Sequence, residues 1–213
     1  MKRVMATLLG LLIAAGAMAQ LADGDQHWNL RAEGSQNGRA KADNVNAAIA
    51  SYQKAVATDP NDLEARWKLL RTLRFKGAYV AASNEEKKQI YAQAKQAGEE
   101  TLTVLDKRLA AKGISSVSKA TEQQVADAAK TIPGASEIFL WDAINWGEWA
   151  LAYGKFAAAR EGAADRIRRA GQPLAKGAHR ASPGSSNRPM TATIRSQSAA
   201  SRTTCLRPDR VKL

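Results

Sequence analysis

Cysteine is nearly absent from this chain of 213 residues, since Cys205 is the only one and no internal disulfide can form. Histidine is almost as scarce: the only two are His27 and His179, in different segments. No spacing of Cys, His, Asp or Glu is typical of a metal site, and no nucleophile has a histidine partner near it. We therefore expect a protein that is not an enzyme and that needs no metal or cofactor.

The sequence also lacks an apolar run of the roughly 20 residues that a comfortable membrane span needs. Its most apolar stretch is residues 4–16, which follows Lys2 and Arg3 and precedes the small residues Ala17–Ala19. This order is typical of a cleaved secretory signal. We expect residues 1–19 to be a signal peptide, cleavage before Gln20, and a periplasmic protein. No cysteine stands directly after the apolar run, so a lipid anchor is not indicated.

Basic charge is plentiful, but it is not spread evenly. The formal net charge is +12, yet residues 4–164 hold 19 basic and 18 acidic residues, whereas residues 165–213 hold 11 and 2. The basic tail has no aromatic residue on which a base could stack. We therefore expect no nucleic-acid partner.

Sustained two-residue alternation is missing as well, and helical periodicity takes its place. Val45, Ala48, Ile49 and Tyr52 follow the i, i+3, i+4, i+7 pattern of one helical face. Helix starts are indicated at Asp62, at Ser83 with Glu86 and at Thr121 with Gln124, and helix ends at Pro60, Gly113 and Pro133-Gly134. We predict an all-α domain over residues 20–169 with no strand of four or more residues.

The predicted helices form pairs that are similar to tetratricopeptide repeats. Ala48, Tyr52, Ala55 and Pro60 match the second half of such a repeat: small residues allow close helix approach, the aromatic ring fills the gap, and proline forces the turn. Trp28 and Ala32 would then lie on the first helix of this pair. The sequence thus predicts tetratricopeptide-like helical hairpins, arranged as an α-solenoid or bundle.

Residues 170–213 differ from the domain in composition. They are rich in Ser, Arg, Pro, Thr and Ala and hold almost no large apolar side chain, so they cannot offset the entropy of ordering. Two interpretations stay open. The segment is either a disordered basic extension or the product of a shifted reading frame that replaces the end of the domain, which would leave the helical domain incomplete.

Three of the five tryptophans lie in one short stretch, residues 136–155, SEIFLWDAINWGEWALAYGK. On a helix, Trp141, Asn145, Trp149 and Tyr153 share a face, and Trp146 lies on the next stripe. Two interpretations stay open: the rings are core, or part of this face lines a cleft in which Asn145 orients a ligand. Our candidate ligand-binding residues are these five, and we expect replacement of Asn145 to leave folding nearly intact.

The same stretch resembles the T-component (TatT) family of TRAP-type transporters, which has an aromatic residue, a small-residue stretch and then Trp-Gly-x-Trp/Ile-Ala. The residues that carry this resemblance are Trp141, Ala143, Trp146, Gly147, Trp149 and Ala150. The resemblance implies a periplasmic helical scaffold that associates with the substrate-binding protein of a TRAP transporter and holds a small hydrophobic or organic-acid ligand. It leaves room for a homo-oligomer. The alternative is a generic periplasmic tetratricopeptide adaptor that binds protein partners and no small molecule.

Overall fold

The computed structural model describes the backbone of residues 2–168 and 171, with side chains from residue 16 onward. These residues form helices, and the only β-pairing among them is an isolated bridge between Gln36 and Arg39. The helices are α1 (Lys2–Asn29), α2 (Ala42–Thr58), α3 (Leu63–Tyr79), α4 (Asn84–Ala110), α5 (Glu122–Ala129), α6 (Ala135–Tyr153) and α7 (Lys155–Arg160). The predicted all-α class is confirmed.

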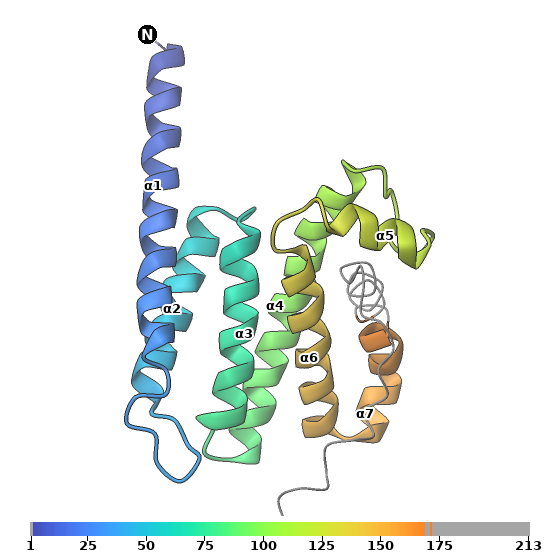
Figure 1. The fold of residues 1–213 in the computed structure, drawn as a ribbon. Helices are drawn as coiled ribbons and strands as arrows, with labels where there is room; N and C mark the ends of the chain where they lie inside the picture. Colours follow the sequence, from blue (N-terminus) through green and yellow to red (C-terminus); the bar gives the residue numbers. More distant parts are fainter. Residues whose placement is uncertain (1, 169–170, 172–213) are drawn as a thin grey trace, which may run out of the picture. The chain divides into compact units, whose positions relative to one another are not determined.

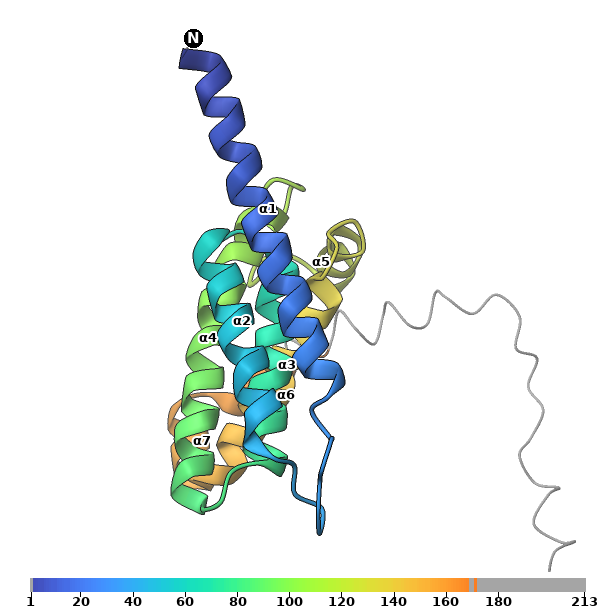
Figure 2. The same cartoon turned by 90° about the vertical axis from the view of Figure 1, so that its left-hand side faces the viewer.

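The first helices pack as consecutive up-and-down neighbours (Figures 1 and 2). α2 packs on both α1 and α3, and α3 packs on α4. α6 returns beside this array and contacts α3 and α4, while α7 follows α6 through a tight turn at Gly154. Helical hairpins therefore continue along the domain, and α6 lies where three other helices meet it.

Helix boundaries follow the capping chemistry of the sequence. Asp62 accepts hydrogen bonds from the backbone N–H of Glu64 and Ala65 at the start of α3, and Ser83 accepts one from Glu86 at the start of α4. Thr121 and Gln124 form a reciprocal capping box at α5. The helix starts expected at these three positions are confirmed.

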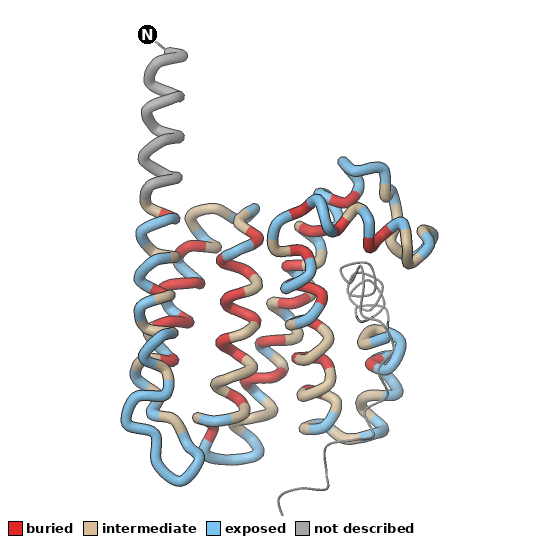
Figure 3. Tube along the Cα trace, viewed as in Figure 1, coloured by how far each residue is buried: buried red, intermediate tan, exposed pale blue. Residues whose placement is uncertain are grey.

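Buried residues occur in each helix from α2 to α6 (Figure 3), and the apolar ones form three clusters. One joins α2, α3 and α4 and is partly covered by α1; it contains Val45, Ala48, Ile49, Tyr52, Leu69, Leu73 and Ala94. Another joins α3, α4, α5 and α6; it contains Leu63, Leu105, Leu109, Val125, Ala129, Ile132, Ala135, Ile138 and Phe139. The third joins α4, α6 and the segment after α7; it contains Tyr91, Trp146, Trp149 and Ala163. The small residues predicted at Ala48 and Ala55 are fully buried, as close helix packing requires.

Polar side chains tie α1 to this interior. The Tyr52 hydroxyl donates to Asp25 Oδ1 at 2.8 Å, and Lys68 Nζ donates to Asp25 Oδ2 at 2.6 Å. Gly24 is required at its position, because a Cβ there would come within 2.5 Å of the Tyr52 ring. Residues 20–29, which follow the expected cleavage point, thus belong to the packed part of α1.

Two details differ from the sequence-based expectations. Ala32 lies in the turn after α1, which ends at Asn29, so only Trp28 of the expected pair is helical. The end of the predicted helical domain is interrupted: α7 ends at Arg160, Gly162 has φ +67°, and helical backbone resumes at residues 163–168. Glycine permits this left-handed conformation, which breaks the helix. The expected tail, apart from residue 171, lies outside the described residues.

Candidate functional site

The tryptophan stretch forms α6, which begins after Gly134 (φ +83°) and ends at Gly154 (φ +88°). Both positions need the left-handed backbone that glycine adopts freely. Between them the helix contacts α3, α4 and α7. Contact with three helices explains why its apolar residues cover a wide arc instead of one narrow stripe.

The five candidate residues differ in their exposure to solvent. Asn145, Trp146 and Trp149 are buried, with 0%, 2% and 6% exposed, whereas Tyr153 is 41% exposed and Trp141 is half-buried. The Trp146 and Trp149 rings meet edge to face at 5.6 Å, and Tyr153 stacks on Trp149 at 4.9 Å. Trp146 and Trp149 therefore serve the core, and Tyr153 carries the aromatic cluster to the surface.

Asn145 is a buried bridge between helices. Its Nδ2 donates to the backbone oxygen of Leu70 in α3 at 3.1 Å and to that of Trp141 at 2.9 Å. Its Oδ1 has no hydrogen-bond partner among the described residues. Because this amide donates to a backbone carbonyl of another helix, we now expect its removal to destabilise the fold, whereas the sequence alone suggested a neutral substitution.

Two cations lie over the buried tryptophans. Lys95 Nζ is 4.7 Å from the Trp146 ring centroid and 5.3 Å from that of Trp149, and the Arg166 guanidinium is 4.9 Å from Trp146. Lys95 also forms ion pairs with Glu99 at 3.5 Å and with Glu161 at 3.3 Å. These contacts fasten the segment after α7 onto α4 and α6.

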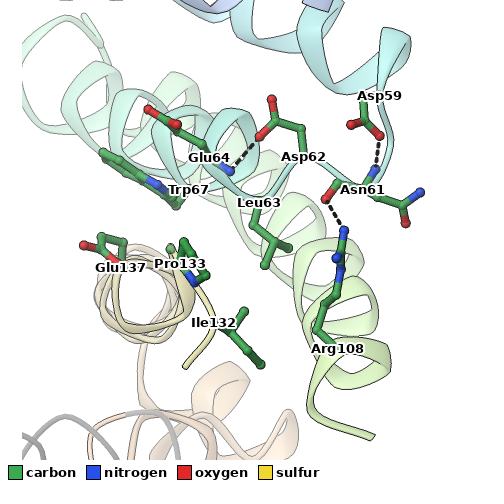
Figure 4. Close-up of a pocket in the computed structure, with 11 residues that line it drawn as sticks. Asp59, Asn61, Asp62, Leu63, Glu64, Trp67, Arg108, Ile132, Pro133 and Glu137 are labelled. Carbon is green, nitrogen blue, oxygen red and sulfur yellow. Dashed lines mark hydrogen bonds between the residues drawn. The ribbon is translucent and has the colours of Figure 1, made fainter. Parts of the chain in front are cut away.

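One pocket, of about 420 Å³, lies where the α2–α3 turn faces the start of α6 (Figure 4). Asp62 and Glu64, with Trp67, line one wall, and Pro133 and Glu137 line the other. Most of its polar atoms are already engaged. Asp62 caps α3, Asp59 accepts from the backbone of Asn61, and Arg108 donates to the Asn61 backbone oxygen.

A second pocket, of about 590 Å³, lies between α4, α6 and the segment after α7. It is lined by Glu99, Leu102, Thr103, Asp106, Val117, Phe139, Asp142, Glu161, Gly162, Asp165 and Arg166. We call it the acidic pocket, because five of these residues are acidic and one is basic. Its volume is within the usual range for small-molecule sites.

Asp142 is the unusual member of the acidic pocket. It is 1% exposed, and neither of its carboxylate oxygens has a hydrogen-bond partner within the described part of the chain. Burial, opposed by the positive charge of Arg166 and assisted by the negative charge of Glu99, raises its pKa to about 6. Burial also raises the pKa of Asp106 in the same pocket.

None of the five residues predicted from the sequence lines either of these two pockets. Asp142 is not among the residues predicted from the sequence, although its position carries a signal. Asp142 lies four residues after Ile138 and four before Trp146, so it interrupts a stripe of α6 that is otherwise apolar and buried. An acid at such a position is rarely found buried without a partner.

The side chains of the described region show no set of three His, Cys, Asp or Glu arranged to hold a metal ion. No helix of that region is long and apolar enough to cross a membrane. The ligand role of the five α6 residues stays a prediction, and the acidic pocket joins it as a second candidate site.

Comparison with known proteins adds no relative: no family model, no curated protein and no solved structure matches this chain.

Proposed function

We propose that this protein is an exported helical scaffold of a TRAP-type solute uptake system, in which it associates with the periplasmic substrate-binding protein. The proposal rests on the α6 motif that resembles the T-component family and on the helical hairpins around it. α6 has Trp146 and Trp149 in the core and leads directly into an exposed apolar turn.

The observation that carries the proposal is the exposure of large apolar side chains at the α6–α7 turn. Phe156 is 95% exposed, Leu151 is 82% exposed and Tyr153 is 41% exposed. Apolar area left in water forgoes about 25 cal/mol per Å² of stabilisation, so such residues gathered within a few positions indicate a surface that another molecule covers. Aromatic side chains are also enriched at the centre of protein interfaces.

The turn holds these side chains in a defined arrangement. Gly154 has φ +88° and separates α6 from α7, so Tyr153 ends one helix while Phe156 begins the next. On α6, Glu148 forms an ion pair with Arg74 at 3.0 Å, which fixes this helix against α3 close to the turn. A rigid base beneath exposed apolar side chains lowers the entropy lost on binding a partner.

The proposal includes a small hydrophobic or organic-acid ligand at the edge of the aromatic cluster. Tyr153 stacks on Trp149 there, and its hydroxyl lies 3.5 Å from the backbone oxygen of Lys88. An exposed ring backed by a buried one offers an apolar surface with a polar group at its rim.

The test uses the full chain and the substrate-binding protein encoded beside the TRAP membrane subunits of the same genome. Binding is measured by sedimentation velocity and titration calorimetry. We expect a complex, and we expect the double variant Leu151→Ser with Phe156→Ser to weaken it by roughly tenfold or more. Leu30→Ser, at a residue that is 47% exposed in the turn after α1, is the matched control and should bind like the parent.

Either of two results would contradict the proposal. One is the absence of a complex at concentrations of roughly 100 μM. The dissociation constant would then exceed that of a specific protein complex. The other is a complex that the double variant and the Leu30→Ser control weaken equally, since the α6–α7 turn would then not be the contact surface.

A further inference from the structure

The acidic pocket has one wall from α4 and one from α6. Glu99, Leu102 and Asp106 line it from α4, and Phe139 and Asp142 line it from α6. Residues 161–166, after α7, close a third side. Both charged and apolar side chains therefore face the same space of about 590 Å³.

Asp142 is packed tightly against the backbone of α4. A Cβ built on Gly98 would collide with Asp142 Oδ1, so only glycine at this position lets the carboxylate approach the helix. The side chain is 1% exposed and its two oxygens are without hydrogen-bond partners in the described region. A buried carboxylate is normally paired, so this one lacks the cation or donors that would satisfy it.

The other acids of the pocket form ion pairs with cations beside it. Lys95 pairs with both Glu99 and Glu161, and Asp165 pairs with Arg168 at 2.7 Å. Three carboxylates thus share two cations, which offset part of the negative charge at the rim, and Asp106 and Asp142 are the remaining acids of the pocket.

Arg166 is the one basic residue that lines the pocket. Its charge acts on Asp106 and on Asp142, but its guanidinium rests on the Trp146 ring and forms no ion pair with either carboxylate. The interior of the pocket therefore holds two carboxyl groups against one guanidinium that is directed elsewhere.

These features select the class of ligand. An organic anion would enter beside two carboxyl groups, which repel it. A metal ion would need several converging ligands, and no such set occurs among the described side chains. A protonated amine needs only a carboxylate for its ammonium group and an apolar wall for its carbon skeleton. Leu102, Val117 and Phe139 supply that wall.

We propose that the acidic pocket binds a monovalent organic cation, an amine with an apolar or aromatic body, whose ammonium group pairs with Asp142 and whose body packs on Phe139. Asp106 assists as a second negative charge. The inference stands apart from the proposed substrate-binding partner, because it concerns the pocket between α4 and α6 and not the α6–α7 turn.

The test compares three probes of nearly equal shape and different charge. Phenethylamine is the cation, 2-phenylethanol is its neutral isostere, and phenylacetate is the anion. Binding of each to the full chain is followed by titration calorimetry and by the change in tryptophan fluorescence at neutral pH. We expect phenethylamine to bind at least tenfold more tightly than 2-phenylethanol, and phenylacetate to bind least.

Variants then assign the site. Asp142→Asn keeps the shape of the side chain and should weaken phenethylamine binding roughly tenfold or more, while binding of 2-phenylethanol changes little. Asp106→Asn should weaken it less. Asp43→Asn removes the same charge from an exposed position in the first turn of α2 and should bind phenethylamine like the parent.

Several outcomes would overturn the inference. One is failure of phenethylamine to bind at about 10 mM, where even weak sites are occupied. Others are equal binding of the cation and its neutral isostere, and preferential binding of phenylacetate. An Asp142→Asn variant that binds phenethylamine like the parent would also overturn it. A variant Asp142→Asn that unfolds more readily than the parent would also overturn it, since the carboxylate would then already have a partner. None of these results bears on the complex with a substrate-binding protein.

Discussion

The two ends of this helical array treat their buried polar groups differently. Between α1, α2 and α3, Asp25 receives hydrogen bonds from Tyr52 and Lys68, and Ser51 donates to Asp23. Between α4 and α6, the Asp142 carboxylate and the Trp146 Nε1 have no partner among the described residues. These polar groups of the N-terminal hairpins thus have partners, whereas the α4–α6 region contains buried polar groups that have none among the described residues.

One exception in the N-terminal region supports the comparison. The Nε of Arg71 has no hydrogen-bond partner in the described region, but its guanidinium lies over Trp28 at 4.0 Å and over Trp67 at 4.9 Å. The two ring faces stabilise the cation. Asp142 has no such contact in place of a hydrogen-bond partner. This makes the acidic pocket a stronger candidate for ligand binding than the surroundings of Arg71.

The largest expected effect tests whether the α6 region is well packed despite its unpartnered groups. Trp149→Ala removes a ring that is 6% exposed and should lower the free energy of unfolding by about 3–5 kcal/mol. Phe156→Ala, at a ring that is 95% exposed, is the control and should change stability by less than about 0.5 kcal/mol. Urea unfolding measures both. Equal stability of the two variants would show that Trp149 is not core.

The sequence allowed the all-α class and the starts of α3, α4 and α5 to be predicted, because period and capping are local properties. Asp62, Ser83 and Thr121 act through backbone groups two or three residues away, so their roles could be inferred from spacing alone. The break at Gly162 was missed because nothing in the surrounding helical pattern required it.

The candidate site was harder to infer, because it depends on contacts between distant helices. The bridge from Asn145 to Leu70 spans 75 positions, and the fit of Asp142 against Gly98 joins α6 to α4. Helical periodicity places a side chain on a face, but it does not say which helix covers that face. The exposed edge at Tyr153 could be anticipated only as the end of the aromatic stripe.

The second expected effect sharpens the comparison through the pH dependence of stability. Asp142 has a pKa of about 6 in the folded protein, above its ordinary value of 3.8, so the native state binds its proton more tightly than the unfolded chain does. Stability from this group is therefore present at low pH and is lost as the pH rises from about 4 to about 6. The gap of about 2 pKa units corresponds to about 3 kcal/mol.

Asp142→Asn removes that dependence. We expect the variant to be about 1–3 kcal/mol more stable than the parent at about pH 7.5 and to lose most of this advantage at about pH 4. Urea unfolding at the two pH values gives the difference, with Asp43→Asn as the exposed control. A variant that is less stable than the parent at the higher pH would reverse the comparison between the two regions.

A smaller loss is expected for Asn145→Ala, which removes the donor to the Leu70 backbone oxygen. We expect a decrease of about 1–3 kcal/mol in the free energy of unfolding, because a buried carbonyl loses its side-chain donor and a small cavity forms. Thermal unfolding of Asn145→Ala and Trp149→Ala side by side shows which variant loses more stability. If Asn145→Ala melts like the parent, the amide contributes nothing to the α3–α6 contact, and its role as a ligand-orienting group gains weight.

The smallest effect belongs to the N-terminal region. Tyr52→Phe removes one hydroxyl that donates to Asp25 at 2.8 Å, while the ring keeps its place against Gly24. Asp25 retains its ion pair with Lys68 at 2.6 Å, so no buried charge is left alone and the loss should be about 1 kcal/mol.

Tyr153→Phe is the matched control, because that exposed hydroxyl makes only a 3.5 Å contact, and it should change stability by less than about 0.5 kcal/mol. Chemical unfolding of both variants near neutral pH checks the order. A Tyr52→Phe variant as stable as the parent would mean that the Asp25 carboxylate is satisfied without this donor. The two regions would then differ only in one cation: Lys68 pairs with Asp25 in the N-terminal region, and no cation pairs with Asp142 in the α4–α6 region.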